Sequence, residues 1–481
     1  MAIADVTFGN LSGLIKEFAP AKYATAVNMA VPVLADNVIK KADPDSSEVL
    51  VYGLPDGMSS TTFVEDLGDL PLGVANTPFE GKAEPKPLIS VIRMGRSVSN
   101  AKMPDAKKAT ILDAHLEAGA RNTARQLGRS LFGGTVKPVA AGGANPLNNQ
   151  WSSLLADSTV ELLFNDVSLF RVGQAYDFVD VDAGSSTARV FVVRCTAVAP
   201  NATGASSSAN VAGRVIFTND VKDNAGNSQL VKTVAGGTVT VTADDLFALR
   251  GTYSRSNFAS NYANTITWGG GTPYANQAEA LAALKTGNAL TSLDDICGDG
   301  ALLDIYGINA TTSNFKGQAI AAGSVPYSQE LVLQSLAQME LYSDMGPNQV
   351  VMSPKLAAAH AASAGTHGAG FGIPASTGTL GGIGRKDIEK SMDKYGAAGK
   401  MTVRGLPITV DPNCPAGKIF MFNDTTLKLY QWREMGVVDE EGNGIRVLDD
   451  KYGFQIQIAG ECELVAHERR DCGSISGLTS L

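Results

Sequence analysis

Residues 104–134 read PDAKKATILDAHLEAGARNTARQLGRSLFGG, and this stretch decides the fold. Pro104 and Asp105 are typical of a helix start, and Gly133 with Gly134 are typical of a helix end. Between them one helical face is apolar or β-branched at intervals of four or seven residues: Leu112, Leu116, Thr123, Leu127 and Leu131. This spacing predicts a helix over residues 105–132, roughly 40 Å long at 1.5 Å per residue.

The other side of this helix is basic. Arg121, Arg125 and Arg129 follow one another at intervals of four, and Glu117 is placed to pair with Arg121. A solvated face is one explanation for such a row. The alternative is that the three arginines contact acidic groups on a neighbouring subunit.

The segments before the helix have little helical or strand periodicity. Residues 1–60 are an arm with short helices expected at 11–18 and at 26–39, the second broken by Pro32. Residues 61–103 are rich in Gly and Pro and contain one extended piece, residues 88–94. This composition predicts a long β-hairpin or extended loop. An isolated hairpin is marginal in water.

These first hundred residues lack a core of their own but are too apolar for a disordered arm. Ordering them would cost on the order of 100 kcal/mol of backbone entropy. Apolar side chains recur in the loop at Phe63, Leu67, Leu70, Leu72 and Phe79. We therefore expect other copies of the chain to cover these residues.

After the helix the composition changes to Val, Thr and Phe. Residues 158–245 contain several such runs separated by turn clusters, with strict alternation at Thr238-Val239-Thr240-Val241-Thr242. The pattern predicts a small antiparallel β sandwich or barrel, with linkers at 139–149 and 254–272. Beyond it helices and strands alternate: a helix from Ser328, strands at 350–352, 406–410, 419–422 and 427–432, and a long extended stretch at 452–467. The fold class is therefore α+β.

Composition excludes several classes of function. The net charge is −9 and the pI about 5.1, which disfavours a basic clamp for nucleic acid. There are 4 histidines and 5 cysteines without a CxxC pair, so we expect no metal centre and reduced thiols. The N-terminus lacks signal-peptide features, and the most apolar stretch, residues 24–35, is too short to cross a bilayer. We expect no membrane association.

No motif has the spacing that catalysis or cofactor binding requires. The glycine-rich stretch 365–384 includes Gly368, Gly370, Phe371 and Gly372 but matches no phosphate-binding loop. The acidic turns near residues 180–184 and 220–227 lack the closing glutamate of a calcium loop. No GxSxG sequence is present. We therefore predict no catalytic residue, no cofactor and no metal ligand.

The order of these parts resembles the major capsid protein of tailed bacteriophages, the Hong-Kong-ninety-seven fold. Phe63–Ala101 is similar to the family's E-loop, and Pro104–Gly134 to its spine helix. Leu293–Ile296, Tyr306–Asn309 and Ser328–Met352 resemble the approach to its axial (A) domain, and residues 405–424 its later strands. Cys462–Leu478 resembles the returning strand of its peripheral (P) domain.

The resemblance implies seven parts. They are an arm (1–60), an E-loop (61–103), the spine helix and start of the P domain (104–157), an inserted β domain (158–245), a linker with a P segment (246–325), an A domain (326–425) and returning P strands (426–481). It implies subunit contacts from the E-loop at Phe63, Leu70, Leu72, Phe79, Ile89 and Ile92, and from the spine helix at Arg121, Arg125 and Arg129. It places Gly368, Gly370, Phe371 and Gly372 in an axial loop.

The function that this resemblance implies is a structural one. The chain would form pentamers and hexamers of an icosahedral shell in the virion, assembled in the bacterial cytoplasm around double-stranded DNA without sequence-specific contact. A separate scaffolding protein, a portal and a decoration protein are expected partners. Lys82 and Lys86 lie in the loop, but no motif assigns them a cross-linking partner. Two alternatives stay open: an encapsulin-like compartment shell, and an oligomeric enzyme with a β-rich accessory domain.

Overall fold

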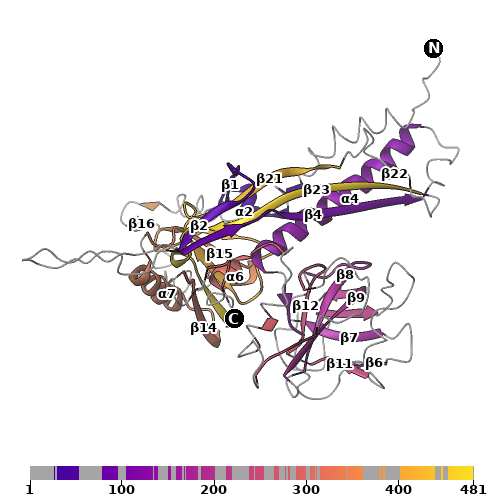
Figure 1. Ribbon diagram of the computed structural model, residues 1–481. Helices are drawn as coiled ribbons and strands as arrows, with labels where there is room; N and C mark the ends of the chain where they lie inside the picture. Colours follow the sequence, from indigo (N-terminus) through magenta and orange to yellow (C-terminus); the bar gives the residue numbers. More distant parts are fainter. Residues whose placement is uncertain are drawn as a thin grey trace, which may run out of the picture. The chain divides into compact units, whose positions relative to one another are not determined.

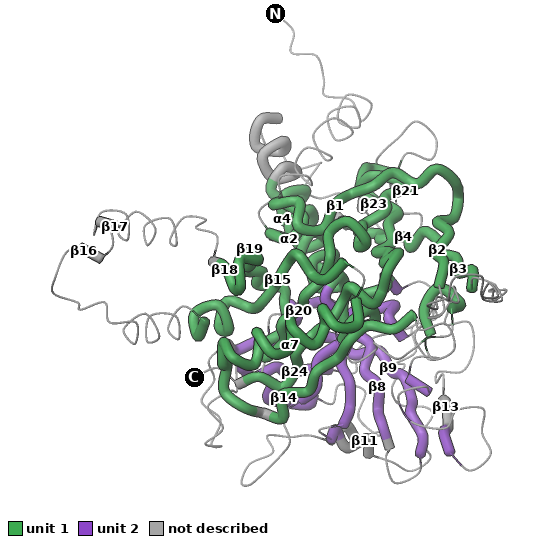
Figure 2. The backbone as a smooth tube through the Cα atoms, turned by 90° about the vertical axis from the view of Figure 1, so that its left-hand side faces the viewer, with its two compact units in different colours: residues 1–131, 290–479, 481 green, residues 132–289, 480 purple. Residues whose placement is uncertain are grey.

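A computed structural model shows a mixed α+β chain with more strand than helix, as predicted. The structure describes residues 26–27, 30–53, 79–95, 105–133, 135–138, 150–152, 159–164, 167, 169–182, 186–200, 213–218, 238–242, 244–253, 265–269, 277, 280–281, 289–298, 304–308, 310, 315–343, 345–360, 379–380, 383–384, 401–438, 446–447 and 453–479. The chain divides into two compact units, which Figure 2 colours separately. Unit 1 comprises residues 1–131, 290–479 and 481, and unit 2 comprises residues 132–289 and 480.

The predicted long helix is present as α4, Asp105–Phe132. In unit 1 it packs against one face of a five-stranded sheet. The strands are β1 (Lys40–Ala42), β21 (Leu427–Val437), β23 (Gly453–Ala466), β22 (Arg446–Val447) and β4 (Lys86–Gly95). Figure 1 shows β4 and β23 running alongside α4. Ile92 of β4, Leu116 of α4, and Ile456 and Ile458 of β23 form the shared core. Gly119 is needed there because a Cβ on it would collide with Ile92.

Of the two alternatives for residues 61–103, a β-hairpin or an extended loop, the described strands do not form a hairpin with each other. The stretch predicted as its extended piece, β4, pairs along its whole length with β23, from Gly95 opposite Gly453 to Lys86 opposite Cys462. The other strand of the region, β3 (Phe79–Ala83), pairs instead with β2 (Val49–Gly53). Local turn chemistry marked the break between β3 and β4, but only long-range pairing chose their partners. The strands β2 and β3 flank residues 54–78.

A second sheet of unit 1 has six strands in the order β14-β24-β20-β15-β19-β18. Their bounds are β14 Gln318–Pro326, β24 Gly473–Thr479, β20 Ile419–Phe422, β15 Gln349–Met352, β19 Leu406–Val410 and β18 Met401–Val403. Helix α7 (Gln329–Tyr342) contributes Val332, Leu336 and Met339 to its core, and residues 354–360 form another helix. The last strand, β24, belongs to this sheet because it pairs with β14 and β20.

Short elements complete unit 1. They are α2 (Pro32–Ala35), α6 (Leu293–Cys297), the 3-10 turn η1 (Arg469–Asp471), and the paired strands β16 (Thr379–Leu380) and β17 (Ile383–Gly384). A helix was expected over residues 26–39. The described residues show helical conformation at 26, 27 and 30, and then the short helix α2, which begins at Pro32. Proline is accepted there because the first helical residue needs no amide donor.

Unit 2 is the predicted β-rich block with wider boundaries. Its strands are β5 (Thr135–Val136), β6 (Gln150–Ser152), β7 (Thr159–Phe164), β8 (Ala175–Asp182), β9 (Thr187–Pro200), β10 (Gly213–Thr218), β11 (Thr238–Thr240), β12 (Leu246–Leu249) and β13 (Thr265–Thr267). The sheet order is β5-β12-β8-β9-β10-β7, all antiparallel, with β13 on β9. A bridge between Pro138 and Phe164 joins its two ends and closes a barrel. The expected linkers were wrong in part, because β13 lies within 254–272.

An aromatic core explains why this barrel forms. Phe164 lies at its centre, with ring centroids 4.6 Å from Phe170 and 5.3 Å from Phe247. Phe217 stacks on Phe247 at 4.8 Å. Along β7 and most of β10, buried residues such as Phe164 and Phe217 alternate with half-buried or exposed ones, so one face of these strands fills the interior.

Candidate assembly surface

The paired strands β2 and β3 have one buried and one exposed face. Val49, Val51 and Ala83 point inward and are buried. Leu50 and Tyr52 on the outer face of β2 are more than two-fifths exposed, and Phe79 at the start of β3 is exposed as well. We call Leu50 and Tyr52 the hairpin face; Phe79 lies opposite Gly53 and therefore on the other side of the pair. Exposed large apolar residues grouped on one surface are typical of an interaction site.

The outer face of β4 is also apolar. Ile89 is 57% exposed and Val91 44%, and we call these two side chains the β4 face. Among the described residues β4 pairs only with β23, so its second edge is open. Native proteins usually cover or charge such an edge. Ile89 and Phe79, two of the predicted subunit contacts, are exposed in the described chain.

Ile92 was predicted as a subunit contact, and this is wrong. It is only 9% exposed, because β4 turns its alternate side chains toward α4. A neighbouring copy cannot reach it without opening the core. Strand periodicity alone could have separated Ile89 from Ile92, since they are three residues apart and lie on opposite faces.

The three arginines of α4 do not share one surface. Arg121 is exposed and pairs with Glu117, as predicted, and Arg125 is exposed. Arg129 is buried, and its Nη1 donates to the carbonyl oxygen of Asn413 at 2.7 Å. The prediction for Arg129 is wrong because a helix turns 100° per residue, so eight residues carry a side chain about 80° around the axis. That rotation brings Arg129 under the loop 411–414.

A third apolar surface was missed by the sequence reasoning. Leu341 is 82% exposed, Tyr342 65% and Met345 67%, at and just beyond the end of α7. We call them the α7 tip. The sequence contained the signal, since Leu341 falls outside the helical face formed by Val332, Leu336 and Met339. Exposed apolar residues of this size beside a helix end indicate a contact surface.

A buried polar cluster joins three distant segments of unit 1. Asp411 accepts hydrogen bonds from the backbone amides of Val33 (3.2 Å) and Asn413 (2.7 Å). The side-chain amide of Asn413 donates to Ala30 O at 2.7 Å. Burial raises the pKa of Asp411, while hydrogen bonds from Asn413 and Val33 and the charge of Arg129 oppose the rise. The cluster fixes residues 30–33 against α4 and the six-stranded sheet.

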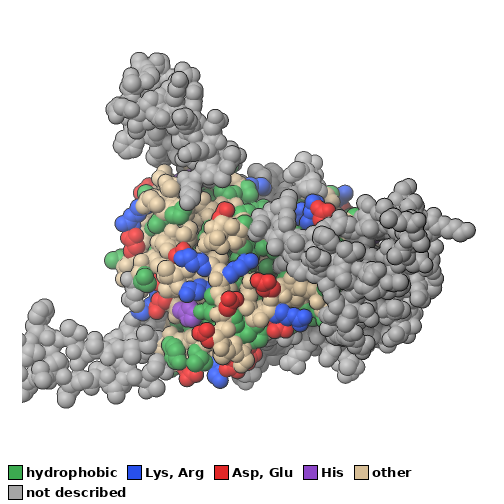
Figure 3. All heavy atoms as spheres, turned by 90° about the horizontal axis from the view of Figure 1, so that it is seen from above, with side chains coloured by type: hydrophobic (Ala, Val, Ile, Leu, Met, Phe, Trp, Pro, Cys, Tyr) green, Lys and Arg blue, Asp and Glu red, His purple; other side chains and the backbone are tan. Residues whose placement is uncertain are grey.

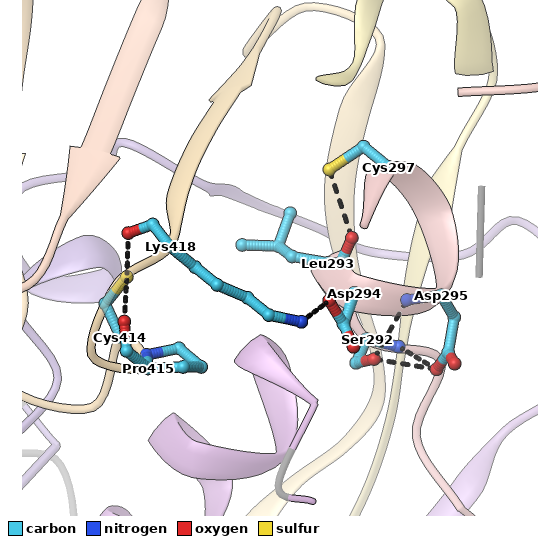
Figure 4. A network of polar contacts seen from close by, with 8 residues as sticks. All are labelled: Ser292, Leu293, Asp294, Asp295, Cys297, Cys414, Pro415 and Lys418. Carbon is cyan, nitrogen blue, oxygen red and sulfur yellow. Dashed lines mark hydrogen bonds and ion pairs between the residues drawn. The ribbon is translucent and has the colours of Figure 1, made fainter. Parts of the chain in front are cut away.

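Helix α6 is held in the same way. Ser292 and Asp295 form a capping box at its start, and the Lys418 ammonium lies 2.7 Å from Asp294. Figure 4 shows the Lys418 side chain extended toward α6 from the strand that follows Pro415. Arg469, fully buried, donates to the carbonyl oxygens of Asp295 (2.6 Å), Ile296 (2.8 Å) and Phe315 (3.1 Å). These contacts make a rigid frame from segments far apart in sequence.

Glu463 is the most notable carboxyl of the frame. It lies on β23, is 1% exposed, and accepts a hydrogen bond from the Thr291 amide at 2.8 Å. Its Oε2 has no hydrogen-bond partner among the described residues. Burial raises its pKa to about 7, which means that the neutral form is favoured inside the protein.

Several predicted residues lie outside the described part of the chain. They are Phe63, Leu70 and Leu72 of the loop, and Gly368, Gly370, Phe371 and Gly372 of the glycine-rich stretch.

Within the described ranges no group of three or more His, Cys, Asp or Glu side chains could hold a metal ion. None of the helices described combines the length and apolar character needed to cross a membrane. All five cysteines are free and buried. On the face shown in Figure 3, apolar side chains lie among acidic and basic ones.

Neither a protein-family model nor a curated protein matches this chain. Solved structures do. The capsid asymmetric unit of cyanophage A-1(L) has 10% identity and a TM-score of 0.46, covering 94% of this chain and 93% of its own. The major capsid and decoration proteins of phage G give 6% identity, a TM-score of 0.32 and coverage of 91% and 87%. The encapsulin complex of Synechococcus elongatus has 13% identity and a TM-score of 0.22. The match covers 44% of this chain and 68% of the encapsulin chain. Most of the similar structures are capsids of phages or phage-like particles.

Proposed function

We propose that this chain is a major capsid protein that assembles into the icosahedral head shell of a tailed bacteriophage and encloses double-stranded DNA. The observation that carries the proposal is the set of uncovered apolar surfaces on an otherwise well-packed frame. The hairpin face, the β4 face and the α7 tip leave seven large apolar side chains exposed, and Phe79 is an eighth. Covering such a side chain fully stabilises a contact by about 1.5–3 kcal/mol.

The frame is suited to a shell because it is rigid. Helix α4 packs on the long strands β4 and β23, and the Asp411 cluster and Arg469 join segments that are more than 150 residues apart. The uncovered surfaces differ from one another, so one copy presents distinct patches to distinct neighbours. Heterologous contacts form rings when the rotation between successive copies closes, and pentamers and hexamers are rings of one chain.

The flanking segments fit the same assignment. Phe63, Leu70 and Leu72 belong to the predicted E-loop, residues 61–103, which would lie across a neighbour. Gly368, Gly370, Phe371 and Gly372 would lie at the capsomer axis. Arg121 and Arg125 would contact acidic groups of an adjacent copy. The chain would act with a separate scaffolding protein, a portal and a decoration protein, assemble in the bacterial cytoplasm and carry out no enzymatic reaction.

Enclosing DNA places few demands on the inner surface. A shell confines its genome without base-specific contact, so the net charge of −9 is compatible with this function. The same charge would oppose the tight phosphate contacts of a DNA-binding enzyme. We expect any DNA contact by the shell to be independent of sequence.

The direct test is electron microscopy of the purified full-length chain, with its proposed scaffold if the chain alone remains unassembled. Closed shells are expected, and particles from infected cells should contain DNA that resists nuclease. Shells that hold a protein cargo and no DNA would instead identify a compartment. A discrete small oligomer under every condition, with or without scaffold, would refute the proposal.

A pair of variants tests the surfaces. Ile89→Asp should abolish shell assembly while the chain remains folded, because it puts a charge on the β4 face. Val172→Asp is the matched control, since Val172 is an exposed apolar residue of unit 2 that belongs to none of the three surfaces. Circular dichroism and gel filtration verify the fold of both. Normal shells from Ile89→Asp would mean that the β4 face is not a contact.

A further inference from the structure

The α7 tip is held in place by its surroundings. Helix α7 ends at Ser343, whose backbone amide donates the last helical hydrogen bond to Met339 O at 2.9 Å. The Met345 amide donates to Asp471 Oδ1 at 3.3 Å, and Asn423 donates to Gly346 O at 2.9 Å. The tip therefore presents its apolar side chains in a fixed arrangement. Ordering it on binding would cost little entropy, which is the property of a preorganised contact.

Among the described residues of α7, the charge nearest to the tip is already paired. The nearest charged side chain of α7, Glu340, is paired with Arg404 at 2.7 Å. A partner that buries Leu341, Tyr342 and Met345 should therefore be apolar and uncharged, because an unpaired charge would lose its hydration there. Large apolar side chains fit best against a surface of small ones, into which they can insert.

The chain itself contains a surface of this kind. Strand β14 reads QAIAAGSVP and has no charged residue. It is an edge strand that pairs only with β24 among the described residues, and β24 has no charged residue either. Ala319, Ala321, Gly323 and Val325 are exposed on it. An uncharged edge of nine residues is normally covered.

We propose that the α7 tip of one copy covers the exposed side of β14 in the next copy. This deepens the proposed function, on which it rests, by naming the two surfaces that join neighbouring copies in a ring. Both surfaces are apolar. The side chains of the α7 tip are large, whereas most of those exposed on β14 are small. Neither surface is covered by the described residues of its own chain. Because the two patches are different, each copy donates its tip to one neighbour and receives a tip from the other, which is the head-to-tail contact that closes rings.

Photo-cross-linking of assembled particles tests the contact without assuming a register. Tyr342 is replaced by p-benzoylphenylalanine in isotopically labelled chains, which are co-assembled with an excess of unlabelled wild-type chains so that particles form. After illumination, mass spectrometry should find the labelled peptide that contains position 342 joined to an unlabelled peptide containing residues 318–326. Cross-links from position 342 to any other inter-chain segment, or none between chains, would overturn the proposal. The same probe at Met345 should give the same partner.

A charge substitution gives a second readout. Leu341→Asp should reduce the particle yield at least about tenfold at a concentration where wild type assembles fully. A tenfold loss corresponds to only about 1.4 kcal/mol of contact energy. Leu341→Met, which keeps an apolar side chain, should assemble like wild type. Val172→Asp again serves as control. Full assembly of Leu341→Asp would reject the α7 tip as a contact even though the chain is a shell protein. Failure of the wild-type chain to form shells under any condition would instead reject the proposed function, so the two failures can be told apart.

Discussion

Replacing Glu463 by Gln should make unit 1 more stable above neutral pH. Burial raises the pKa of this carboxyl from its ordinary value of 4.5 to about 7 in the folded chain. The folded state therefore holds a proton that the unfolded state releases between about pH 4.5 and 7. Stability from the neutral carboxyl is complete below about pH 4.5 and is lost as the pH rises to about 7.

The size of the effect follows from the same pKa change. At about 1.4 kcal/mol per pKa unit, the free energy of unfolding falls by about 3 kcal/mol across this range. The side-chain amide introduced by Glu463→Gln would keep an oxygen to accept the Thr291 amide proton and would never ionise. Glu463→Gln and wild type should thus be similar near pH 4.5, and the variant should be more stable by about 3 kcal/mol at about pH 8.

Urea unfolding of dilute, unassembled chain measures this difference. Trp432 packs beside Val465 in unit 1, so its fluorescence reports on the region when the other two tryptophans are replaced by Phe. Glu461→Gln, a less buried change two residues away on β23, is the control for altered net charge. If the gap between Glu463→Gln and wild type does not widen with pH, the inference of a neutral buried carboxyl is wrong.

Three further predictions concern packing. Arg129→Met should cost about 1–3 kcal/mol, because it leaves a buried carbonyl without its donor, whereas Arg121→Met on the exposed face should change the urea midpoint little. Gly81→Ala should lower the melting temperature, because its Cβ would lie 2.6 Å from a backbone carbonyl; Gly436→Ala, with its nearest neighbour at 3.9 Å, should not. Phe164→Ala should cost about 3–5 kcal/mol in unit 2. Calorimetry of each variant measures these effects, and equal behaviour of a variant and its control would contradict the packing described.

Local signals determined much of this protein. The start and end of α4 follow from Pro104, Asp105 and two glycines, and the strands at 406–410 and 419–422 have the predicted bounds. Alternation of apolar residues likewise revealed the β-rich block. Each of these features depends on neighbours within a few residues, so the sequence alone was sufficient for them.

Pairing and burial between distant residues were decided by the tertiary structure. Nothing near β4 indicates that it pairs with β23, several hundred residues later, rather than with β3. Helix geometry puts Arg129 about 80° around the axis from Arg121, but only the tertiary structure shows that residues 411–414 cover Arg129 while Arg121 stays exposed. Register and long-range contact depend on which surfaces meet when the chain folds, and a single sequence states the chemistry of those surfaces without stating their partners.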